Sequence, residues 1–161
     1  MTALLRTIAD LRRAVGTTLG PSEWVTIDQA QIDAFAEVTG DHQWIHVDPL
    51  RAAAGDFHST IAHGYLTLSL TPMLMDQLTQ LRQGATSINY GLNRLRFLTP
   101  VPAGGRVRLR AKVLGVADRP PEGVLATYQV SYELEGANRP ALVAETIGLL
   151  IARTEVAGSQ G

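Results

Sequence analysis

The hydrophobic pattern of the chain changes near residue 84, from a helical period to a strand period. Before this point, apolar residues recur every three or four positions, interrupted by GTTLGP (16–21) and by GDHQWIHVD (40–48). After it, apolar and polar residues alternate in four stretches: TSINYGLNRLRFLTPV, RVRLRAKVLGVAD, VLATYQVSYELEG and ALVAETIGLLIAR. Turn-forming residues separate these predicted strands, in PAGG, RPPEG and GANRP. Helices followed by an antiparallel meander predict an α+β fold.

Several helices are expected before residue 84. Asp28 can cap a helix over DQAQIDAFAEVTG that ends at Gly40, and Asp48-Pro49 combines an N-cap with proline at the first position of a short helix. The strongly apolar segment 61–80 predicts a long central helix. Further expected elements are an amphipathic helix over residues 2–15 and a short strand within SEWVTI, residues 22–27. One apolar helix and one curved sheet suggest a sheet that wraps a helix, which is the hot-dog architecture.

The length and composition fit one domain with a substantial core. The chain has 161 residues, 45% of them hydrophobic, so we expect a single hot-dog domain over residues 1–161, with residues 1–20 as an N-terminal helical extension. The net charge of −1 gives no reason to expect binding to nucleic acid or to an anionic membrane. Residues 57–75 carry no charged side chain, but their histidine, serine, threonine and proline content favours a buried helix over a membrane span.

The chain contains no cysteine. Disulfides, thiolate nucleophiles and cysteine zinc sites are therefore excluded. The absence also fits a reducing compartment, and we expect the protein in the cytoplasm.

All four histidines of the chain lie between positions 42 and 63, in and shortly after GDHQWIHVD. Asp41, Asp48 and Asp56 lie in or beside the same window. A loop-rich segment can collect polar residues without a function. However, a dense group of titratable side chains next to the start of an apolar helix is typical of an active site, and we favour that interpretation.

Three kinds of chemistry fit this cluster. Metal binding could use His42 and His46, four residues apart, with a later histidine, but there is no HExxH pattern and Asp48-Pro49 would interrupt a common helix. We therefore expect no metal. A serine or threonine nucleophile lacks the GxSxG sequence that would present it. The third hypothesis is paired general acid and base catalysis by Asp41 and His46, which can exchange protons with one water near neutral pH.

These residues carry a resemblance to a known family. GDHQWIHVDP followed by IAHG resembles the MaoC-like dehydratases, the (R)-specific enoyl-CoA hydratases of hot-dog fold. Their motif is Gly-Asp-x-Asn-Pro-aliphatic-His, with a later Ala/Val-His-Gly turn. The matching positions here are Gly40, Asp41, Ile45, His46, Ala62, His63 and Gly64. FLTPVPAGGRV resembles the family's Phe-x-x-Pro-Val-x-x-Gly turn, and the QWIH variant is similar to a nodulation-protein-N-like subgroup.

The resemblance implies roles for these residues. Asp41 and His46 would hold the catalytic water, and the Gly64 N–H would bind the thioester oxygen of a trans-2-enoyl-CoA substrate. Gln43 replaces the family's asparagine and keeps its amide, so we expect it to orient the substrate or the water. His63 would fix the turn beside the substrate. Coenzyme A is part of this substrate, so no separate cofactor is expected.

Other residues could also contribute to substrate binding. Tyr65, at the start of the central helix, could line an acyl tunnel, although most of that helix should be core. Trp44 is expected to pack under its loop, with the wall of an acyl pocket as the alternative. Alternating arginines on two predicted strands form either a solvated sheet face, which we favour, or a site for coenzyme A phosphates. These arginines are Arg94, Arg96, Arg106, Arg108 and Arg110.

Two alternative functions stay open at this point. A hot-dog thioesterase usually has an acidic base on the central helix, and no Asp or Glu lies between Phe57 and Met75. A non-catalytic acyl-CoA-binding protein is compatible with the departures from the family motif. One of these is Pro72, at a position where some members have a serine that holds the aspartate, with Ser69 and Thr71 nearby. Whichever of these functions holds, we expect a homodimer joined at a sheet edge.

Overall fold

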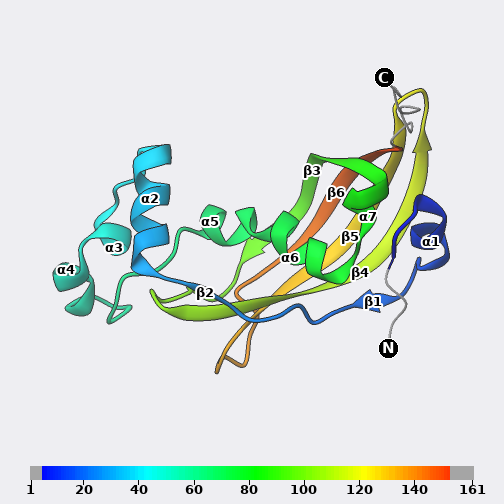
Figure 1. Cartoon of the computed structure of the whole chain (residues 1–161). Coiled ribbons are helices and arrows are strands. Elements are labelled where there is room, and N and C mark those ends of the chain that lie inside the picture. Colours follow the sequence, from blue (N-terminus) through cyan, green and yellow to red (C-terminus); the bar gives the residue numbers. More distant parts are fainter. Residues whose placement is uncertain (1–4, 153–161) are drawn as a thin grey trace, which may run out of the picture.

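The computed structural model describes residues 5–152 and is built on one six-stranded antiparallel sheet (Figure 1). Two short strands, β1 (Thr18–Leu19) and β2 (Val25–Ile27), both pair with β4. The predicted strand at residues 22–27 is thus present in its second half. The four long strands predicted from the alternating pattern are β3 (Ala85–Phe97), β4 (Gly105–Arg119), β5 (Gly123–Leu134) and β6 (Leu142–Ala152).

The neighbours of β3 differ from the expectation. The strand order is β1-β4-β5-β6-β3, so only β4, β5 and β6 form a meander, and β3 pairs with β6 at the far edge. The prediction of a four-strand meander is therefore wrong. Alternation identifies a strand and its buried face, but the choice of neighbour depends on how the whole sheet closes around its core.

The sheet curves around a central helical segment, as Figure 1 shows. The prediction of one helix over residues 61–80 is wrong, because the segment forms two helices, α5 (Gly64–Ser69) and α6 (Thr71–Leu78), separated at Leu70. Pro72 accounts for the break, since proline has no N–H to donate and its ring clashes with the preceding turn. Among the described residues, no helix is long and apolar enough to cross a bilayer.

The core lies between the concave face of the sheet and these helices. Tyr132 of β5 is one of its largest fully buried side chains, and its hydroxyl lies 2.7 Å from the Thr71 hydroxyl at the helix break. A polar pair therefore links the sheet to the break in the helix. Around it pack fully buried apolar side chains from both layers, among them Leu74, Ile32, Val107, Leu109 and Leu142.

The first helix, α1 (Ile8–Arg13), is shorter than the predicted helix over residues 2–15, of which residues 2–4 lie outside the described part. Thr7 begins it with a capping box that involves Asp10, so a polar signal rather than the apolar pattern sets its start. The residues after it include β1, which joins the sheet. The division into an N-terminal extension and a domain stays a prediction.

The helices α2 (Gln29–Thr39), α3 (Trp44–Val47) and α4 (Pro49–Ala53) gather at one end of the molecule (Figure 1), and α7 (Leu81–Gly84) leads into β3. The predicted caps are confirmed. The Asp28 carboxylate accepts from the Gln31 N–H at 2.9 Å, and Gly40 ends α2 with a left-handed φ of 75°. The Asp48 carboxylate accepts from the Arg51 N–H at 3.0 Å and begins α4.

Because α2 ends immediately before Asp41, its cap can be tested by mutation. Asp28→Ala removes the acceptor of the capping bond, and we expect the free energy of unfolding to fall by about 1 kcal/mol in urea denaturation. Asp28→Asn keeps a side-chain oxygen at the same place and should stay close to the wild type. Equal stability of the alanine variant and the wild type would show that the cap does not hold α2.

Candidate active site

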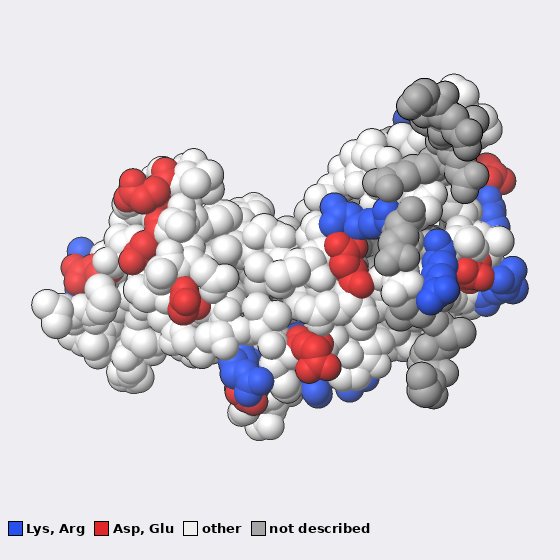
Figure 2. Space-filling model, viewed as in Figure 1, with Lys and Arg blue, Asp and Glu red and all other residues white. Residues whose placement is uncertain are grey.

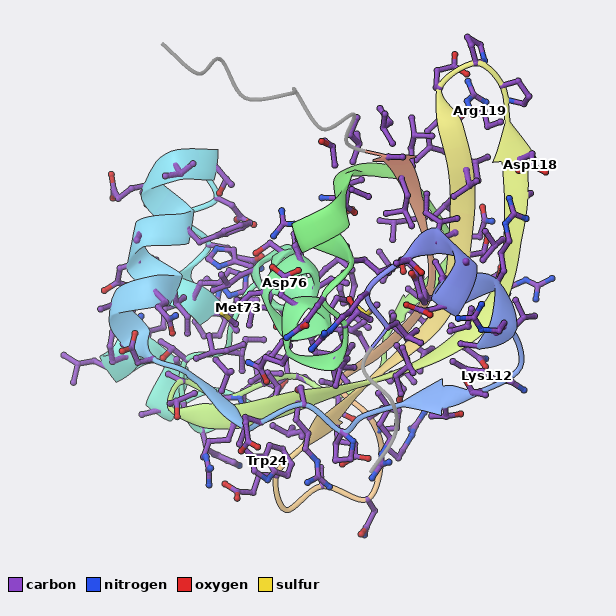
Figure 3. All side chains as sticks on the ribbon, turned by 45° about the vertical axis from the view of Figure 1, so that its right-hand side comes forward. Trp24, Met73, Asp76, Lys112, Asp118 and Arg119 are labelled. Carbon is purple, nitrogen blue, oxygen red and sulfur yellow. The ribbon has the colours of Figure 1, made fainter. Side chains whose placement is uncertain are left out.

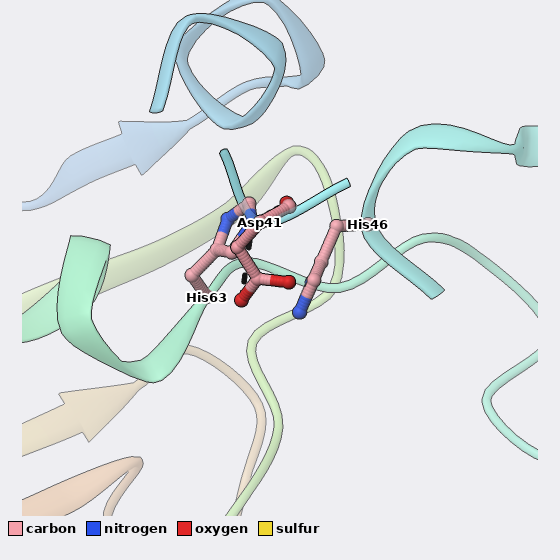
Figure 4. Close-up of side chains that lie close together, drawn as sticks. All are labelled: Asp41, His46 and His63. Carbon is pink, nitrogen blue, oxygen red and sulfur yellow. Dashed lines mark hydrogen bonds and ion pairs between the residues drawn. The ribbon is translucent and has the colours of Figure 1, made fainter. Parts of the chain in front are cut away.

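Three polar side chains from two separate segments meet beside the end of α2. Asp41 follows the turn at Gly40, His46 lies on α3, and His63 directly precedes α5. One carboxylate oxygen of Asp41 and one ring nitrogen of each histidine all lie within 4.8 Å of one another (Figure 4). Both histidines are buried, whereas the Asp41 side chain is 55% exposed. The group therefore combines a solvent-facing carboxylate with buried imidazoles.

A hydrogen bond to the main chain fixes the tautomer of His46. Its Nδ1 lies 2.7 Å from the Ile61 carbonyl oxygen, and a carbonyl can only accept, so the proton is on Nδ1. Nε2 therefore keeps a free lone pair. Burial lowers the pKa of His46 below its ordinary value of 6.5, partly offset by the bond to Ile61. His46 is thus neutral at neutral pH and can accept a proton at Nε2.

His63 holds the Asp41 turn against His46. Its Nε2 donates to the Asp41 main-chain oxygen at 3.0 Å and lies 4.0 Å from the Asp41 carboxylate. Its ring stacks on that of His46, with centroids 3.8 Å apart and planes 25° apart. Within residues 5–152, the buried Nδ1 of His63 has no hydrogen-bond partner. These contacts tie the turn at Asp41 to the segment before α5, and the role of His63 in the reaction stays a prediction.

The backbone around His46 is also held from α2. The Gln29 side-chain amide donates to the His46 carbonyl at 2.8 Å, and the Thr60 hydroxyl donates to the Gln29 side-chain oxygen. The Ile61 N–H donates to the Ile45 carbonyl at 3.0 Å. The position of the imidazole therefore depends on α2, α3 and the segment before α5 together.

A cavity of about 480 Å³ opens next to His46 and is lined in part by Gly64, Tyr65, Thr67 and Phe97. A Cβ atom on Gly64 would lie 2.8 Å from the Phe97 ring, so this packing requires glycine. Tyr65 meets Phe97 edge to face, with ring centroids 5.6 Å apart, and is itself 67% exposed. The size suits a small organic group.

A second cavity, of about 510 Å³, lies between the central helices and strands β3, β5 and β6. Tyr65 lines both cavities, so they adjoin at this residue. The surface over α5, in the depression between the two ends of the molecule, shows no Lys, Arg, Asp or Glu side chain in Figure 2. The approach to this region is therefore uncharged on that face.

The remaining candidates lie apart from the cavity. Gln43 is exposed at the N-cap of α3, where its side chain makes no capping bond. Trp44 packs under its loop as expected, because a Cβ on Gly55 would meet its ring at 3.1 Å and the Arg51 guanidinium lies 4.5 Å from the ring centroid. Neither residue lines the cavity beside His46.

The structure brings together a different set of possible metal ligands from the histidines suggested by the sequence spacing. His42 is exposed and lies 3.6 Å from Glu37, and His58 is exposed with a φ of 58°. By spacing, a metal ion could instead be held by Asp41, His46 and His63. The absence of a metal in the working protein stays a prediction.

Three comparisons with known proteins bear on the family. Residues 10–133 match the model of the MaoC like domain. The chain is 50% identical over 145 residues to 3-hydroxyacyl-thioester dehydratase Z of Mycobacterium tuberculosis (strain ATCC 25618 / H37Rv), covering 90% of this chain and 96% of the relative. The chain belongs to the MaoC-like dehydratase family.

Two further relatives agree with this assignment. Nodulation protein N of Rhizobium leguminosarum bv. viciae is 46% identical over 145 residues, covering 89% of this MaoC-like chain and 90% of the relative. The solved (R)-hydratase of A. caviae superposes with a TM-score of 0.67 at 29% identity, covering 84% of this chain and 95% of the hydratase. The predicted family, the hot-dog fold and the hydro-lyase class are therefore confirmed.

Two positioning residues of this MaoC-like site were not predicted from the sequence. Phe97 packs on Gly64 and Tyr65, and Gln29 holds the His46 backbone. Phe97 belongs to the FLTPV turn, which therefore contained a signal. No sequence signal pointed to Gln29, because a glutamine in the first turn of a helix is ordinary. Ser69 and Thr71, on either side of the break before Pro72, donate to carbonyls of their own helical segment.

The arginines of the sheet are mostly neutralised by acids. Trp24 lies on the side of β4 opposite α6 (Figure 3), with the Arg108 and Arg106 guanidinium carbons 4.4 and 5.7 Å from its ring centroid. The position of these guanidinium groups on the side of β4 away from α6 supports the interpretation of the alternating arginines as a solvated sheet face. The ion pairs are Arg106–Glu135 at 2.8 Å, Arg108–Glu133 at 2.5 Å, Arg94–Glu145 at 3.0 Å and Arg110–Glu133.

Because the pKa of His46 is lowered, the free energy of unfolding depends on pH in a predictable direction. An unfolded chain protonates histidine near pH 6.5, whereas burial keeps His46 neutral to lower pH in the folded protein. The unfolded state therefore binds more protons below this value, and the free energy of unfolding falls as the pH falls. We expect His46→Gln to flatten this slope between about pH 7 and pH 5 in denaturant titrations.

His58→Asn is the matched control, because His58 is exposed and asparagine adopts its left-handed backbone readily. This variant should keep the wild-type slope. An unchanged slope in His46→Gln would contradict the assignment of the buried neutral imidazole.

Proposed function

We propose that the protein is an (R)-specific enoyl-CoA hydratase, which adds water to trans-2-enoyl-CoA and also catalyses the reverse dehydration. The observation that carries the proposal is the position of the Asp41 carboxylate within 4.8 Å of the neutral imidazole of His46, which lines a cavity. Two groups at this separation can both hydrogen bond to one water molecule. The names of the hydratase and dehydratase relatives support the choice of substrate.

The proposed mechanism uses both groups on that water. His46 Nε2 and Asp41 orient the water and accept a proton from it while its oxygen bonds to the third carbon of the acyl chain. The electrons of the carbon–carbon double bond move toward the thioester oxygen. A proton then passes from the pair to the second carbon, so the sum of the steps is the addition of one water. The two residues act as a coupled unit.

Gly64 is the proposed donor to the thioester oxygen. It is the first residue of α5, where the backbone N–H has no partner inside the helix, and His63 provides no side-chain cap. It lines the same cavity as His46. Such a donor stabilises a developing oxyanion by about 3 kcal/mol.

The alternative functions have less support. The acid of the central helices is Asp76, which pairs with Arg82 at 2.7 Å and does not line the cavity beside His46. A thioesterase base at that position is therefore disfavoured. A non-catalytic binder would need neither the fixed His46 tautomer nor a nearby carboxylate, so the geometry favours an enzyme.

The outer edge of β3 supports a homodimer. β3 pairs with β6 on one side only, and its exposed apolar side chains include Ile88, Tyr90 and Leu92, each between 44% and 46% exposed. A long, unpaired, apolar edge strand is a template for pairing with another chain. A second copy joined antiparallel at β3 would extend the sheet and cover this edge. The cytoplasmic location stays a prediction from composition.

The hydratase proposal is tested with crotonyl-CoA. We expect the wild type to remove the conjugated enoyl-thioester absorbance and to form (R)-3-hydroxybutyryl-CoA. Asp41→Asn and His46→Gln should each lower kcat by at least about a hundredfold, because each removes one proton-transfer group. Circular dichroism should show that both variants keep the fold.

His42→Gln, an exposed neighbour outside the cavity, is the matched control and should keep wild-type turnover. Near-normal rates in Asp41→Asn or His46→Gln would refute the roles of these residues. Release of free coenzyme A without hydration would identify a thioesterase.

The dimer is tested by placing a charge on its edge. Ile88→Glu introduces a negative charge on β3, and we expect it to convert the protein from a dimer to a monomer in light scattering. Val38→Glu is the control, because Val38 is an equally apolar residue, 86% exposed, on α2. A monomeric wild type, or a dimer that persists in Ile88→Glu, would contradict pairing through β3.

A further inference from the structure

His46 belongs to a cyclic hydrogen-bond network that holds both its main chain and its imidazole. Its Nδ1 donates to the Ile61 carbonyl at 2.7 Å, and its own carbonyl accepts from the Gln29 side-chain amide at 2.8 Å. Thr60, the residue before Ile61, closes the network because its hydroxyl donates to the Gln29 side-chain oxygen. The two ends of His46 are therefore bonded to groups that are also bonded to each other.

The partners of the Gln29 amide fix its orientation. The amide nitrogen lies 2.7 Å from the Asp33 carboxylate and 2.8 Å from the His46 carbonyl, and both of these groups accept hydrogen bonds. The nitrogen donates its two hydrogens to them, so the amide oxygen faces the hydroxyl of Thr60, which is buried. Each side of the amide thus has a defined partner.

The VPAGG turn, residues 101–105, anchors the segments on both sides of this network. The Ala103 N–H donates to the Thr60 carbonyl and the Gly104 N–H donates to the Ile27 carbonyl, both at 2.8 Å. Ile27 is the last residue of β2, just before α2 begins, so a single turn fixes the segment of Thr60 relative to the start of α2. The turn belongs to the FLTPVPAGGRV motif, and none of the proposed reaction steps uses it.

Gln29 and Thr60 have no direct access to a substrate, because neither residue lines either of the two cavities. Gln29 lies in the first turn of α2, and the same helix ends directly before Asp41. The network therefore ties His46 to the helix that presents the carboxylate.

We propose that Gln29 and Thr60 are positioning residues for the hydration reaction and that the turn at residues 101–105 holds them together. This inference rests on the proposed hydratase function. The pair fixes the carbonyl and the imidazole of His46 at once, so Nε2 stays directed at the water that it shares with Asp41. Without the pair, the imidazole can shift relative to the carboxylate, and a small misplacement of a proton-transfer group lowers the rate strongly.

The first test removes the Gln29 amide. Gln29→Met keeps the length of the side chain without its hydrogen bonds, and we expect kcat for crotonyl-CoA to fall about tenfold. KM should stay within about twofold of the wild type, because the residue does not contact the substrate. Gln31→Met is the matched control in the same turn of α2. The Gln31 side-chain oxygen accepts from the Asp28 N–H at 3.0 Å, so this change should lower stability and keep kcat.

Thr60 provides a second test of the same network. Thr60→Val removes the hydroxyl at nearly constant shape and should lower kcat to a similar extent, whereas Thr60→Ser keeps the donor and should stay close to the wild type. Because the two residues act as one unit, the double variant Gln29→Met/Thr60→Val should lose no more activity than either single variant. Losses that multiply would contradict a shared action.

The imidazole gives a readout that does not depend on turnover. NMR of protein labelled at the histidine ring nitrogens should show a protonated Nδ1 and an unprotonated Nε2 for His46 in the wild type. Its signals are identified by their absence in His46→Gln. We expect Gln29→Met to mix the two tautomers and Gln31→Met to keep the single one.

A wild-type kcat in Gln29→Met would overturn the inference. An equal loss of kcat in Gln31→Met would also overturn it, since the stability of α2 would then account for the effect. Either result with active hydration by the wild type leaves the hydratase proposal intact. If the wild type does not hydrate crotonyl-CoA, the tautomer decides, and an unchanged tautomer in Gln29→Met overturns the inference.

Two adjacent glycines test the role of the turn. A Cβ on Gly105 would lie 2.8 Å from the Pro102 oxygen, so Gly105→Ala forces the backbone of the turn to move. Gly104 has a φ of 82° and open space around it, and asparagine adopts this conformation readily. We expect Gly105→Ala to lower kcat about tenfold and Gly104→Asn to keep it. A wild-type kcat in Gly105→Ala would show that the turn does not hold the pair.

Discussion

The hydrogen bond from His46 Nδ1 to the Ile61 carbonyl is the interaction on which the site depends. It is 2.7 Å long, buried, and joins α3 to the segment that leads into α5. It places the proton on Nδ1, and so it leaves Nε2 free to accept one. Burial then keeps the ring neutral by lowering its pKa. Without this bond, the same residues would be a histidine of undefined tautomer beside an exposed carboxylate.

The surrounding contacts can be understood as support for that bond. His63 stacks on His46 and binds the Asp41 main chain, so the carboxylate stands beside the imidazole although the aspartate itself is exposed. Gln29 holds the His46 carbonyl from the first turn of α2. At the break between α5 and α6, the Thr71 hydroxyl lies 2.7 Å from the Tyr132 hydroxyl, which links the helical segment to β5.

The sequence predicted the long strands, the caps of α2 and α4 and the pair Asp41 and His46, because these depend on local periodicity and short motifs. It did not predict the position of β3 beside β6, since alternation carries no information on the neighbour. The break in the central helix does not follow from the apolar pattern of residues 61–80, because that pattern is continuous across Pro72, where proline interrupts the helix. Gln29 and the stacking of His63 on His46 depend on tertiary contacts between segments distant in the chain.

The central claim is that Asp41 and His46 act together on one water, on one side of the substrate. Hydration of crotonyl-CoA in deuterium oxide tests it directly, because the relative configuration at the second and third carbons can be read by NMR. A single water held by both groups delivers its hydroxyl and its deuteron to the same face, so the account predicts syn addition. Anti addition would require proton donors on opposite faces and would contradict the shared-water mechanism.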